Sequence, residues 1–254
     1  MQSASRSDPG QPGQAERPGQ PGPAAAVPRR VPEASVARLP RYLRALEELQ
    51  VELVPTVSSE TLAELAGVKA TQVRKDLSHL GTLGTRGSGY DVGSLMARIE
   101  REIGLNRDWL VAIVGVGNLG RALALYSGLP GKGFRVTALV DSDPAKVGQV
   151  VGGVEVSPLS DLGKVVAASR ASIGVVATPA SSAQNAADLL VAAGVSAILN
   201  FAPASLVVPP GIDLRHVDVS TELQILAFYQ SRKHVCPTSV EGGMEKSRHG
   251  AGPS

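Results

Sequence analysis

Short apolar runs alternate with amphipathic stretches over the second half of the chain. Runs of this length are typical of parallel strands that are buried on both faces. They predict strands at residues 110–114, 135–140, 173–177 and 195–199. Helical patterns stand between them, at residues 121–126, in a helix that ends over 165–168, and at 183–193. The alternation predicts a right-handed, doubly wound Rossmann sheet, an α/β fold.

A glycine-rich segment follows the first predicted strand and fits the pattern G-x-G-x-x-G. In this pattern Gly115 permits a tight turn, Gly117 lets the backbone approach a pyrophosphate, and Gly120 lets the next helix pack on the strand. The unpaired N–H groups of that helix favour an anion. The residues of the motif predicted to bind a dinucleotide are Gly115, Val116, Gly117, Asn118, Leu119 and Gly120.

An acid follows the second predicted strand at the expected distance. Asp141 lies 21 positions after Gly120, near the offset of about 20 for the carboxylate that binds an adenosine ribose. An acid there repels a 2′-phosphate, so we expect NAD or NADH rather than NADP. The alternative is a glycine-rich turn that closes a sheet and binds nothing.

Loops after the strands complete the predicted site. A turn at 143–148 frames the adenosine pocket. Two loops, at 178–179 and 200–203, follow later strands and lie at the edge where open α/β sheets bind ligands. These two loops are assigned to the nicotinamide end, although simple proline-stiffened connections would look similar. The predicted cofactor residues outside the glycine motif are Asp141, Lys146, Thr178, Pro179, Asn200, Phe201 and Ala202.

The first half of the chain has helical periodicity and turn signals. An amphipathic helix begins near Ser35, a second begins at Ser58–Glu60 and ends at Gly67, and a third covers 70–80. Two short helices joined by a glycine turn predict a helix-turn-helix. The glycine-rich segment 81–90 suits a β-hairpin "wing" with Arg86 near its tip. Another helix, 91–103, completes a winged-helix domain.

Positive charge is concentrated on the third helix and the wing. From Ser35 to Gly104 bases and acids balance at nine each, yet between Lys69 and Arg86 four bases face one acid, Asp76. Contacts to phosphates and groove edges need such a concentration of charge. A small helical cap with incidental lysines is the alternative. The predicted DNA-binding residues are Lys69, Thr71, Gln72, Arg74, Lys75, Ser78, Arg86 and Tyr90.

The segment 220–230 is a helix with hardly any polar face, so most of its surface has to be buried. Little chain is left to cover it, which predicts burial in a partner subunit. A two-fold homodimer also suits a helix-turn-helix that reads a palindrome. The expected organisation is a disordered tail over 1–32, a winged helix over 33–104, a Rossmann domain over 105–218, a dimerisation helix over 219–231 and a second tail over 232–254.

Composition narrows the choice of function. The net charge of +2 calls for no nucleic acid or membrane by itself, and a single cysteine excludes a disulfide framework or multi-cysteine metal site. Without an apolar run that spans a bilayer, or a signal-peptide core, we expect a cytoplasmic protein without membrane or metal.

Groups for hydride chemistry are scarce. Of four histidines only His216, next to Asp218, is placed for proton transfer, and no inserted substrate domain is present. Dinucleotide binding without turnover therefore fits better than an enzyme. Two rivals stay open: an NAD-dependent oxidoreductase with an N-terminal interaction module, and a nucleotide-binding structural scaffold.

The order of motifs is similar to that of the bacterial redox-sensing repressor family Rex, from Val31 to about Gln230. The matching segments are Arg38–Arg44 (RLPRYLR), Gln72–Leu77 (QVRKDL), Gly84–Tyr90 (GTRGSGY), Gly115–Gly120, Val140–Gly148 (VDSDPAKVG), Asn200–Pro203 and Val217–Asp218.

The resemblance implies a homodimer that represses respiratory and fermentative genes while NADH is low and leaves its inverted-repeat operator when NADH rises. It also implies a C-terminal helix swapped between subunits and a relay in which Asp218 exchanges partners between Tyr126 and Arg44. Some members have a basic residue inside the glycine motif where this chain has Asn118. The long N-terminal tail lies outside the family pattern.

Overall fold

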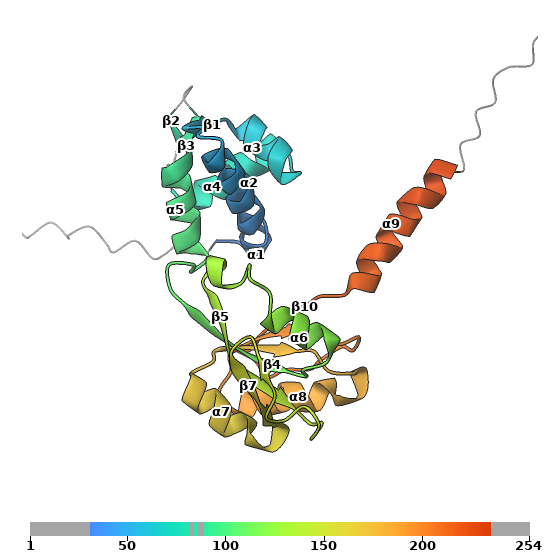
Figure 1. Ribbon diagram of the computed structural model, residues 1–254. Helices are drawn as coiled ribbons and strands as arrows, with labels where there is room; N and C mark the ends of the chain where they lie inside the picture. Colours follow the sequence, from blue (N-terminus) through green and yellow to red (C-terminus); the bar gives the residue numbers. More distant parts are fainter. Residues whose placement is uncertain (1–30, 82–83, 86–88, 235–254) are drawn as a thin grey trace, which may run out of the picture. The chain divides into compact units, whose positions relative to one another are not determined.

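A computed structural model describes residues 31–81, 84–85 and 89–234 and divides the chain into two compact units after Gly104. Arg86 and nearly all of both expected tails lie outside the described residues. Within the described ranges, no helix is long and apolar enough to cross a membrane. The two units are described separately (Figure 1).

The first unit is a winged helix, as predicted. Its elements are α1 (Glu33–Val36), α2 (Leu39–Val51), β1 (Thr56–Val57), α3 (Ser59–Ala66), α4 (Ala70–His79), β2 (Gly84–Thr85), β3 (Gly89–Asp91) and α5 (Val92–Glu102). The strands form an antiparallel sheet in the order β1-β3-β2. Strand β1 was not expected from the sequence, and the single helix predicted from Ser35 is two helices, α1 and α2.

Local capping chemistry explains where these helices begin and end. The Ser58 hydroxyl accepts a hydrogen bond from Thr61 N at 3.0 Å and begins α3, and the Asp91 carboxylate caps α5 by accepting from Ser94 N at 2.8 Å. Gly67, at φ +66°, ends α3 in the left-handed conformation that glycine adopts without strain. The Gly67 cap sets the tight turn between α3 and α4, as the sequence predicted.

The second unit is a seven-stranded sheet in the order β10-β9-β8-β4-β5-β7-β6. Its elements are β4 (Trp109–Val114), α6 (Asn118–Ala124), the 3₁₀ turn η1 (Pro130–Lys132), β5 (Phe134–Asp141), β6 (Val150–Val151), β7 (Val154–Pro158), η2 (Leu159–Asp161), α7 (Leu162–Ser169), β8 (Ile173–Val176), α8 (Ala180–Ala192), β9 (Ala197–Asn200), β10 (Asp213–His216) and α9 (Val219–His234). All neighbouring strands are parallel except β6 and β7. The Rossmann prediction is confirmed.

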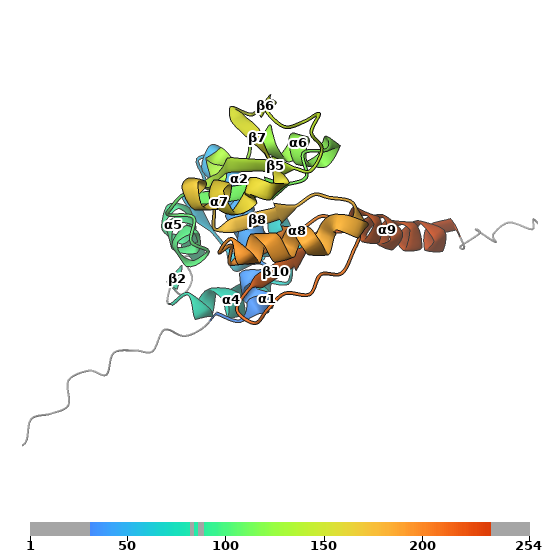
Figure 2. The same cartoon turned by 90° about the horizontal axis from the view of Figure 1, so that it is seen from below.

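Helices cover both faces of this sheet (Figures 1 and 2). On one face α7 and α8 bury Leu162, Val166 and Leu190 against the strands. On the other face Leu123 and Ala124 of α6 pack beside Ile113 and Leu139. Strand β5, which follows β4 in the chain, pairs with one edge of β4, and the later strand β8 pairs with its other edge. Their diverging connections open a crevice at the carboxyl ends of β4 and β8, where such folds bind ligands.

Helix α6 and the hairpin of β6 and β7 differ most from the sequence prediction. Helix α6 begins at Asn118, inside the glycine motif, and ends at Ala124, so the predicted span of 121–126 is wrong. The helix begins early because Gly117 is its N-cap and Gly120 has to lie inside its first turn. The hairpin of β6 and β7 was not predicted, although Gly152 and Gly153 have φ of +60° and +81°, as its two-residue turn requires.

Helix α9 is apolar around its circumference and exposed. Among its large side chains, Leu223, Leu226, Phe228 and Tyr229 are each more than half exposed. A surface of this kind is costly to leave in water. Within the part of the chain that the structure describes, nothing covers the helix that the sequence predicted to be buried.

We expect Gly120→Ala to destabilise the second unit by about 1–3 kcal/mol, the usual cost of overpacking. An added Cβ would lie 1.9 Å from the carbonyl oxygen of Gly115, which is backbone and can shift little. Urea unfolding measures the loss. Gly117→Ala is the matched control, because its Cβ would meet nothing within 4 Å and its φ of −77° is ordinary. Equal stabilities of the two variants would contradict this packing role.

Candidate functional site

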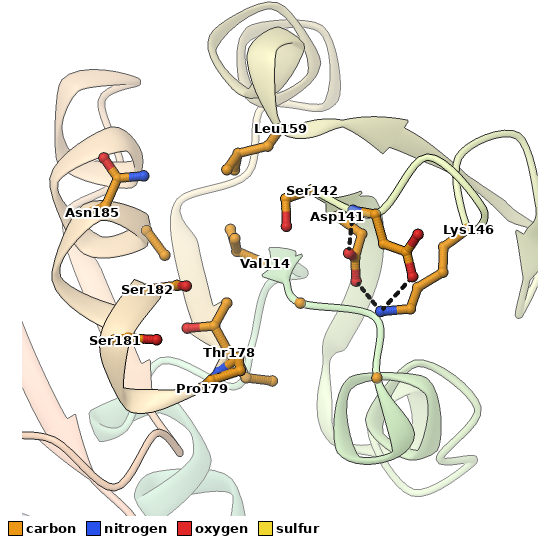
Figure 3. Close-up of a pocket in the computed structure, with 15 residues that line it drawn as sticks. Val114, Asp141, Ser142, Lys146, Leu159, Thr178, Pro179, Ser181, Ser182 and Asn185 are labelled. Atoms are coloured by element: carbon orange, nitrogen blue, oxygen red, sulfur yellow. Dashed lines mark hydrogen bonds and ion pairs between the residues drawn. The ribbon is translucent and has the colours of Figure 1, made fainter.

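A cavity of about 650 Å³ lies at the crevice between the carboxyl ends of β4, β5 and β8 (Figure 3). One side is formed by the glycine loop and the Asp141 turn, and the other by the start of α8. The lining residues are Val114, Gly115, Gly117, Asp141, Ser142, Asp143, Lys146, Leu159, Ala177, Thr178, Pro179, Ser181, Ser182, Asn185 and Ala186. Six of the predicted cofactor residues are thus brought together: Gly115, Gly117, Asp141, Lys146, Thr178 and Pro179.

The tight turn at Gly115 and the close packing at Gly120 are as the sequence predicted, while the approach of a pyrophosphate to Gly117 stays a prediction. Gly115 has φ +97°, and a Cβ there would lie 2.6 Å from the carbonyl oxygen of Ala177. Gly120 lies against the backbone of Gly115. Beside Gly117 there is open space, and this residue lines the cavity. A side-chain-free backbone facing open space is what a closely approaching phosphate group requires.

Asp141 is nearly buried and is held by donors from two loops. One oxygen, Oδ2, accepts from Val116 N at 2.7 Å and Lys146 Nζ at 3.0 Å, and Oδ1 accepts from Asp143 N at 2.8 Å. Burial by itself would raise the pKa of Asp141, but these hydrogen bonds together lower it below its usual value. The carboxylate therefore stays charged, ties the glycine loop to β5 and keeps acceptor capacity on Oδ1.

The start of α8 is the part of the cavity that sequence reasoning missed. The side chains of Ser181, Ser182 and Asn185 come from its first turns and face the Asp141 side across the cavity (Figure 3). Thr178, just before the helix, has a buried hydroxyl oxygen without a hydrogen-bond partner among the described residues. Small polar residues directly after Pro179 were a signal for this face, because proline commonly stands at a helix start.

Several predicted cofactor residues do not line this cavity. Val116, Asn118, Leu119 and Gly120 belong to the motif but lie outside the lining, as do Asn200, Phe201 and Ala202. Asn200 is fully buried and holds its own loop: its Oδ1 accepts from Ala202 N at 2.9 Å and its Nδ2 donates to Ala204 O at 2.8 Å.

His216, considered above as a proton donor, also has a structural partner. Its Nδ1 lies 2.9 Å from the Asn200 amide nitrogen, and the ring does not line the cavity. Because an amide nitrogen only donates, Nδ1 accepts this hydrogen bond.

The predicted DNA-binding face lies on α4 and includes exposed bases. Thr71, Arg74, Lys75 and Ser78 are exposed, while Gln72 and Tyr90 are half-buried. Lys69 is the N-cap position of α4. Arg74 is already engaged: its Nη1 donates at 2.7 Å to both Ser59 Oγ and Glu60 Oε1 on α3. This ion pair was not predicted from the sequence.

Asp76, counted above as an acid on the basic face, instead lies fully buried beneath it. It accepts hydrogen bonds from Arg38 Nε (2.6 Å) and Nη2 (2.8 Å), Ser35 Oγ (2.8 Å), Tyr42 OH (2.7 Å) and Gln72 Nε2 (2.9 Å). Since Arg38 neutralises it, the acid does not offset the positive charge of the α4 surface. The charge count along the sequence was therefore wrong in assigning Asp76 to that face.

The ionisation of this cluster is shifted strongly. Burial alone would raise the pKa of Asp76, but hydrogen bonds from Arg38, Tyr42, Ser35 and Gln72 hold it well below its usual value. The hydrogen bond to Asp76 raises the pKa of Arg38. Burial, followed by the same hydrogen bond, raises the pKa of Tyr42. The carboxylate and guanidinium are therefore both charged at neutral pH.

The three residues expected to form a relay have separate surroundings in the single chain. Arg44 is exposed and pairs with Glu48 at 3.6 Å. Tyr126 lies two residues beyond α6, not in that helix as expected, and is 60% exposed. Asp218 accepts from Ser220 N (2.9 Å) and Thr221 Oγ1 (2.8 Å) at the start of α9, and these bonds, with that of the Ser220 hydroxyl foremost, lower its pKa to about 2.

No group of three or more His, Cys, Asp or Glu side chains placed to hold a metal ion is found within the described residues.

Comparison with known proteins identifies relatives over nearly the whole described chain. Residues 30–78 match a family model described as "Putative DNA-binding protein N-terminus", and residues 106–204 match one described as "CoA binding domain". The redox-sensing transcriptional repressor Rex of Streptomyces avermitilis is 56% identical over 216 residues, which cover 85% of this chain and 86% of the relative.

Solved structures of a Rex-family repressor called RSP are also similar. RSP in complex with β-NAD⁺ and operator DNA has a TM-score of 0.76 and 36% identity, covering 81% of this chain and 95% of that one. RSP in complex with β-NADH has a TM-score of 0.73 and 35% identity, covering 81% and 96%.

We expect acid to destabilise the first unit through Asp76. A carboxyl group whose folded pKa is depressed contributes stability that is present above its unfolded pKa, about 3.9, and is lost as the pH falls towards its folded pKa. Urea unfolding followed by circular dichroism at pH 7 and pH 3 measures this loss. At pH 7 the free energy of unfolding of Asp76→Asn should be lower than that of the wild type by on the order of 3 kcal/mol. On acidification the variant should lose less of its free energy of unfolding than the wild type does. Equal losses in both proteins would contradict the assignment.

Proposed function

The chain belongs to the Rex family of redox-sensing transcriptional repressors, and we propose that it binds an inverted-repeat operator as a homodimer and releases it when NADH binds. It is a repressor and not an enzyme, as the names of its relatives support. Its targets are respiratory and fermentative genes, and it acts in the cytoplasm without membrane or metal.

The observation that carries the proposal is the cavity at the glycine loop in a chain that also has a winged helix. The cavity fits a dinucleotide at three points. Gly117 offers bare backbone to the pyrophosphate, and Asp141 offers an acceptor to the adenosine ribose. Thr178 offers a buried hydroxyl that has no partner among the described residues. The bound dinucleotide supplies a nicotinamide ring that is positively charged when oxidised and neutral when reduced.

Selectivity for NADH over NADPH follows from Asp141. Its carboxylate is ionised and buried on the side of the cavity where the ribose is placed, so it repels a 2′-phosphate. Lys146, at 3.0 Å from Asp141 and 3.7 Å from Asp143, is shared between two acids and is not a free cation for that phosphate. The other motif residues, Val116, Asn118, Leu119 and Gly120, shape the loop. Asn200, Phe201 and Ala202 retain their proposed place near the nicotinamide.

Operator recognition is assigned to α4 and the wing. Lys69, Lys75 and Arg74 neutralise phosphates, and Thr71, Gln72 and Ser78 reach the major groove. Tyr90 supports the wing, whose Arg86 contacts an adjacent minor groove. Arg74 has to leave Glu60 or share its guanidinium between Glu60 and a phosphate. Binding should therefore weaken steeply with salt.

Release of the repressor from its operator is assigned to a change within the dimer. The exposed apolar surface of α9 supports burial in a second copy of the chain, with the helix swapped between subunits. Asp218, at the start of α9, then exchanges partners between Tyr126 and Arg44 as the cofactor changes its redox state. NADH has to bind more tightly to the form of the dimer that cannot bind DNA than to the form that can. Each tenfold ratio between these two affinities corresponds to about 1.4 kcal/mol.

Fluorescence anisotropy on an inverted-repeat duplex at fixed salt tests this function. NADH should weaken operator binding at least tenfold, because it selects the dimer that cannot hold DNA. NAD⁺ at the same concentration should have little effect. Equal operator affinities in the two titrations would refute the proposal.

A matched pair of variants tests the relay in the same assay. Asp218→Ala should bind the operator but lose most of the difference between NADH and NAD⁺. Ser220→Ala removes a capping partner and leaves the carboxylate in place, so it should keep that difference. If Asp218→Ala is released by NADH as the wild type is, Asp218 has no part in the switch.

Thr178→Val should weaken NADH binding about three- to tenfold, the effect of one lost hydrogen bond. Its thermal stability should not fall, because the removed hydroxyl is buried without a partner. Calorimetric titration with NADH measures the affinity. Thr137→Val is the control: the Thr137 hydroxyl is also buried with no partner in the described part of the chain, but it lies in β5 away from the cavity lining. Unchanged affinity in Thr178→Val would exclude this contact.

A further inference from the structure

The buried carboxylate of Asp76 has more hydrogen bonds than its burial requires. An ionised carboxylate has about four lone-pair sites. Ser35 of α1, Arg38 at the N-cap position of α2 and Tyr42 of α2 already supply four donors to them. The fifth donor is Nε2 of Gln72, at 2.9 Å, and it comes from α4 itself.

The fifth hydrogen bond fixes the direction of the Gln72 amide. Asp76 stays ionised, so both of its oxygens only accept, and the amide of Gln72 can present nitrogen but not oxygen to it. The amide carbonyl is therefore turned away from Asp76. A glutamine without such a neighbour exchanges its oxygen and nitrogen by rotation about the last bond.

Gln72 is a half-buried residue on the helix that carries the exposed Thr71, Arg74 and Lys75. Its Nε2 has two hydrogens, of which Asp76 takes one. The carbonyl oxygen and the second N–H remain, and this acceptor and donor match the N6 amino group and N7 of adenine in the major groove. A freely rotating amide would have to be ordered on binding, at an entropic cost.

We propose that Asp76 is a positioning residue for sequence recognition: it orients Gln72 so that α4 reads an A·T pair in each operator half-site. The inference rests on the proposed DNA-binding function and adds a specificity determinant to it. Arg38 has a different part, because its bidentate ion pair with Asp76 compensates the buried charge and keeps the carboxylate ionised.

Selection of duplexes from a randomised half-site pool tests the inference. Wild type, Asp76→Asn, Gln72→Leu and Tyr42→Phe are compared at one salt concentration. The wild type should prefer A·T at one half-site position about tenfold or more, as expected for a bidentate base contact. Gln72→Leu should lose this preference, and Asp76→Asn, whose amide also donates, should reduce it below about threefold.

Tyr42→Phe is the matched control. It removes one of the five hydrogen bonds to the same buried carboxylate without changing the neighbour of Gln72. Its thermal stability should fall while its base preference stays, whereas a merely structural role of Asp76 would give the two variants the same preferences. The inference is refuted if Asp76→Asn keeps the A·T preference, or if Gln72→Leu does.

A measurement on the folded wild type covers the case in which Asp76→Asn does not fold. The side-chain amide of Gln72, assigned by its loss in Gln72→Leu, should give one NH₂ pair in nitrogen-15 spectra, with hydrogen exchange at least tenfold slower than in an exposed glutamine. Exchange at the exposed rate would refute the inference. If the wild type enriches no sequence at all, the DNA-binding function fails as well, so the two failures are distinguishable.

Discussion

A carboxylate that is removed from water has to be surrounded by donors, and both units of this chain are built around one. Asp76 in the winged helix and Asp141 in the Rossmann unit are the two acids that are buried among the residues the structure describes. Each takes donors from segments distant in sequence, such as Arg38 for Asp76 and Val116 for Asp141. Since an unsatisfied buried charge is far more costly than a lost surface contact, each acid fixes the relative position of those segments. In both units the fixed segment is the one that faces the proposed ligand.

The two acids differ in whether their carboxylate oxygens keep acceptor capacity for a ligand. Asp141 has only three donors, so its Oδ1 keeps room for a ribose hydroxyl at the cost of incomplete saturation. Asp76 has five donors and no exposure, so it contacts no ligand and acts only through its neighbours. An acid that binds a ligand and an acid that positions a residue are therefore distinguished by counting donors, although both are buried and both have a lowered pKa.

The sequence predicted what depends on local spacing. The strands, the glycine motif and Asp141 at its offset could be read from the chain because each follows from the period of a strand or the geometry of one turn. The burial of Asp76 could not be predicted in this way, because its position in the helix is equally compatible with an exposed face. Its burial is evident only from its contacts with Arg38 and Tyr42, which lie more than thirty positions earlier in the chain. The same holds for Glu60 as the partner of Arg74. The polar start of α8 was missed for another reason, since serines at a helix start are explained equally well by capping.

The proposed switch has to compete with bonds that already exist in the single chain. Asp218 is held by Ser220 and Thr221, and Arg44 by Glu48. All of these groups lie at the surface, where water replaces a broken ion pair or capping bond at little cost. Asp76 and Asp141 are the opposite, because their bonds cannot be exchanged without exposing a buried charge. Exchange of partners is therefore expected at Asp218 and Arg44, while the two buried acids keep α4 and the glycine loop unchanged in both states. A repressor that changes its affinity for DNA without rebuilding its reading helix needs this division between fixed and exchangeable carboxylates.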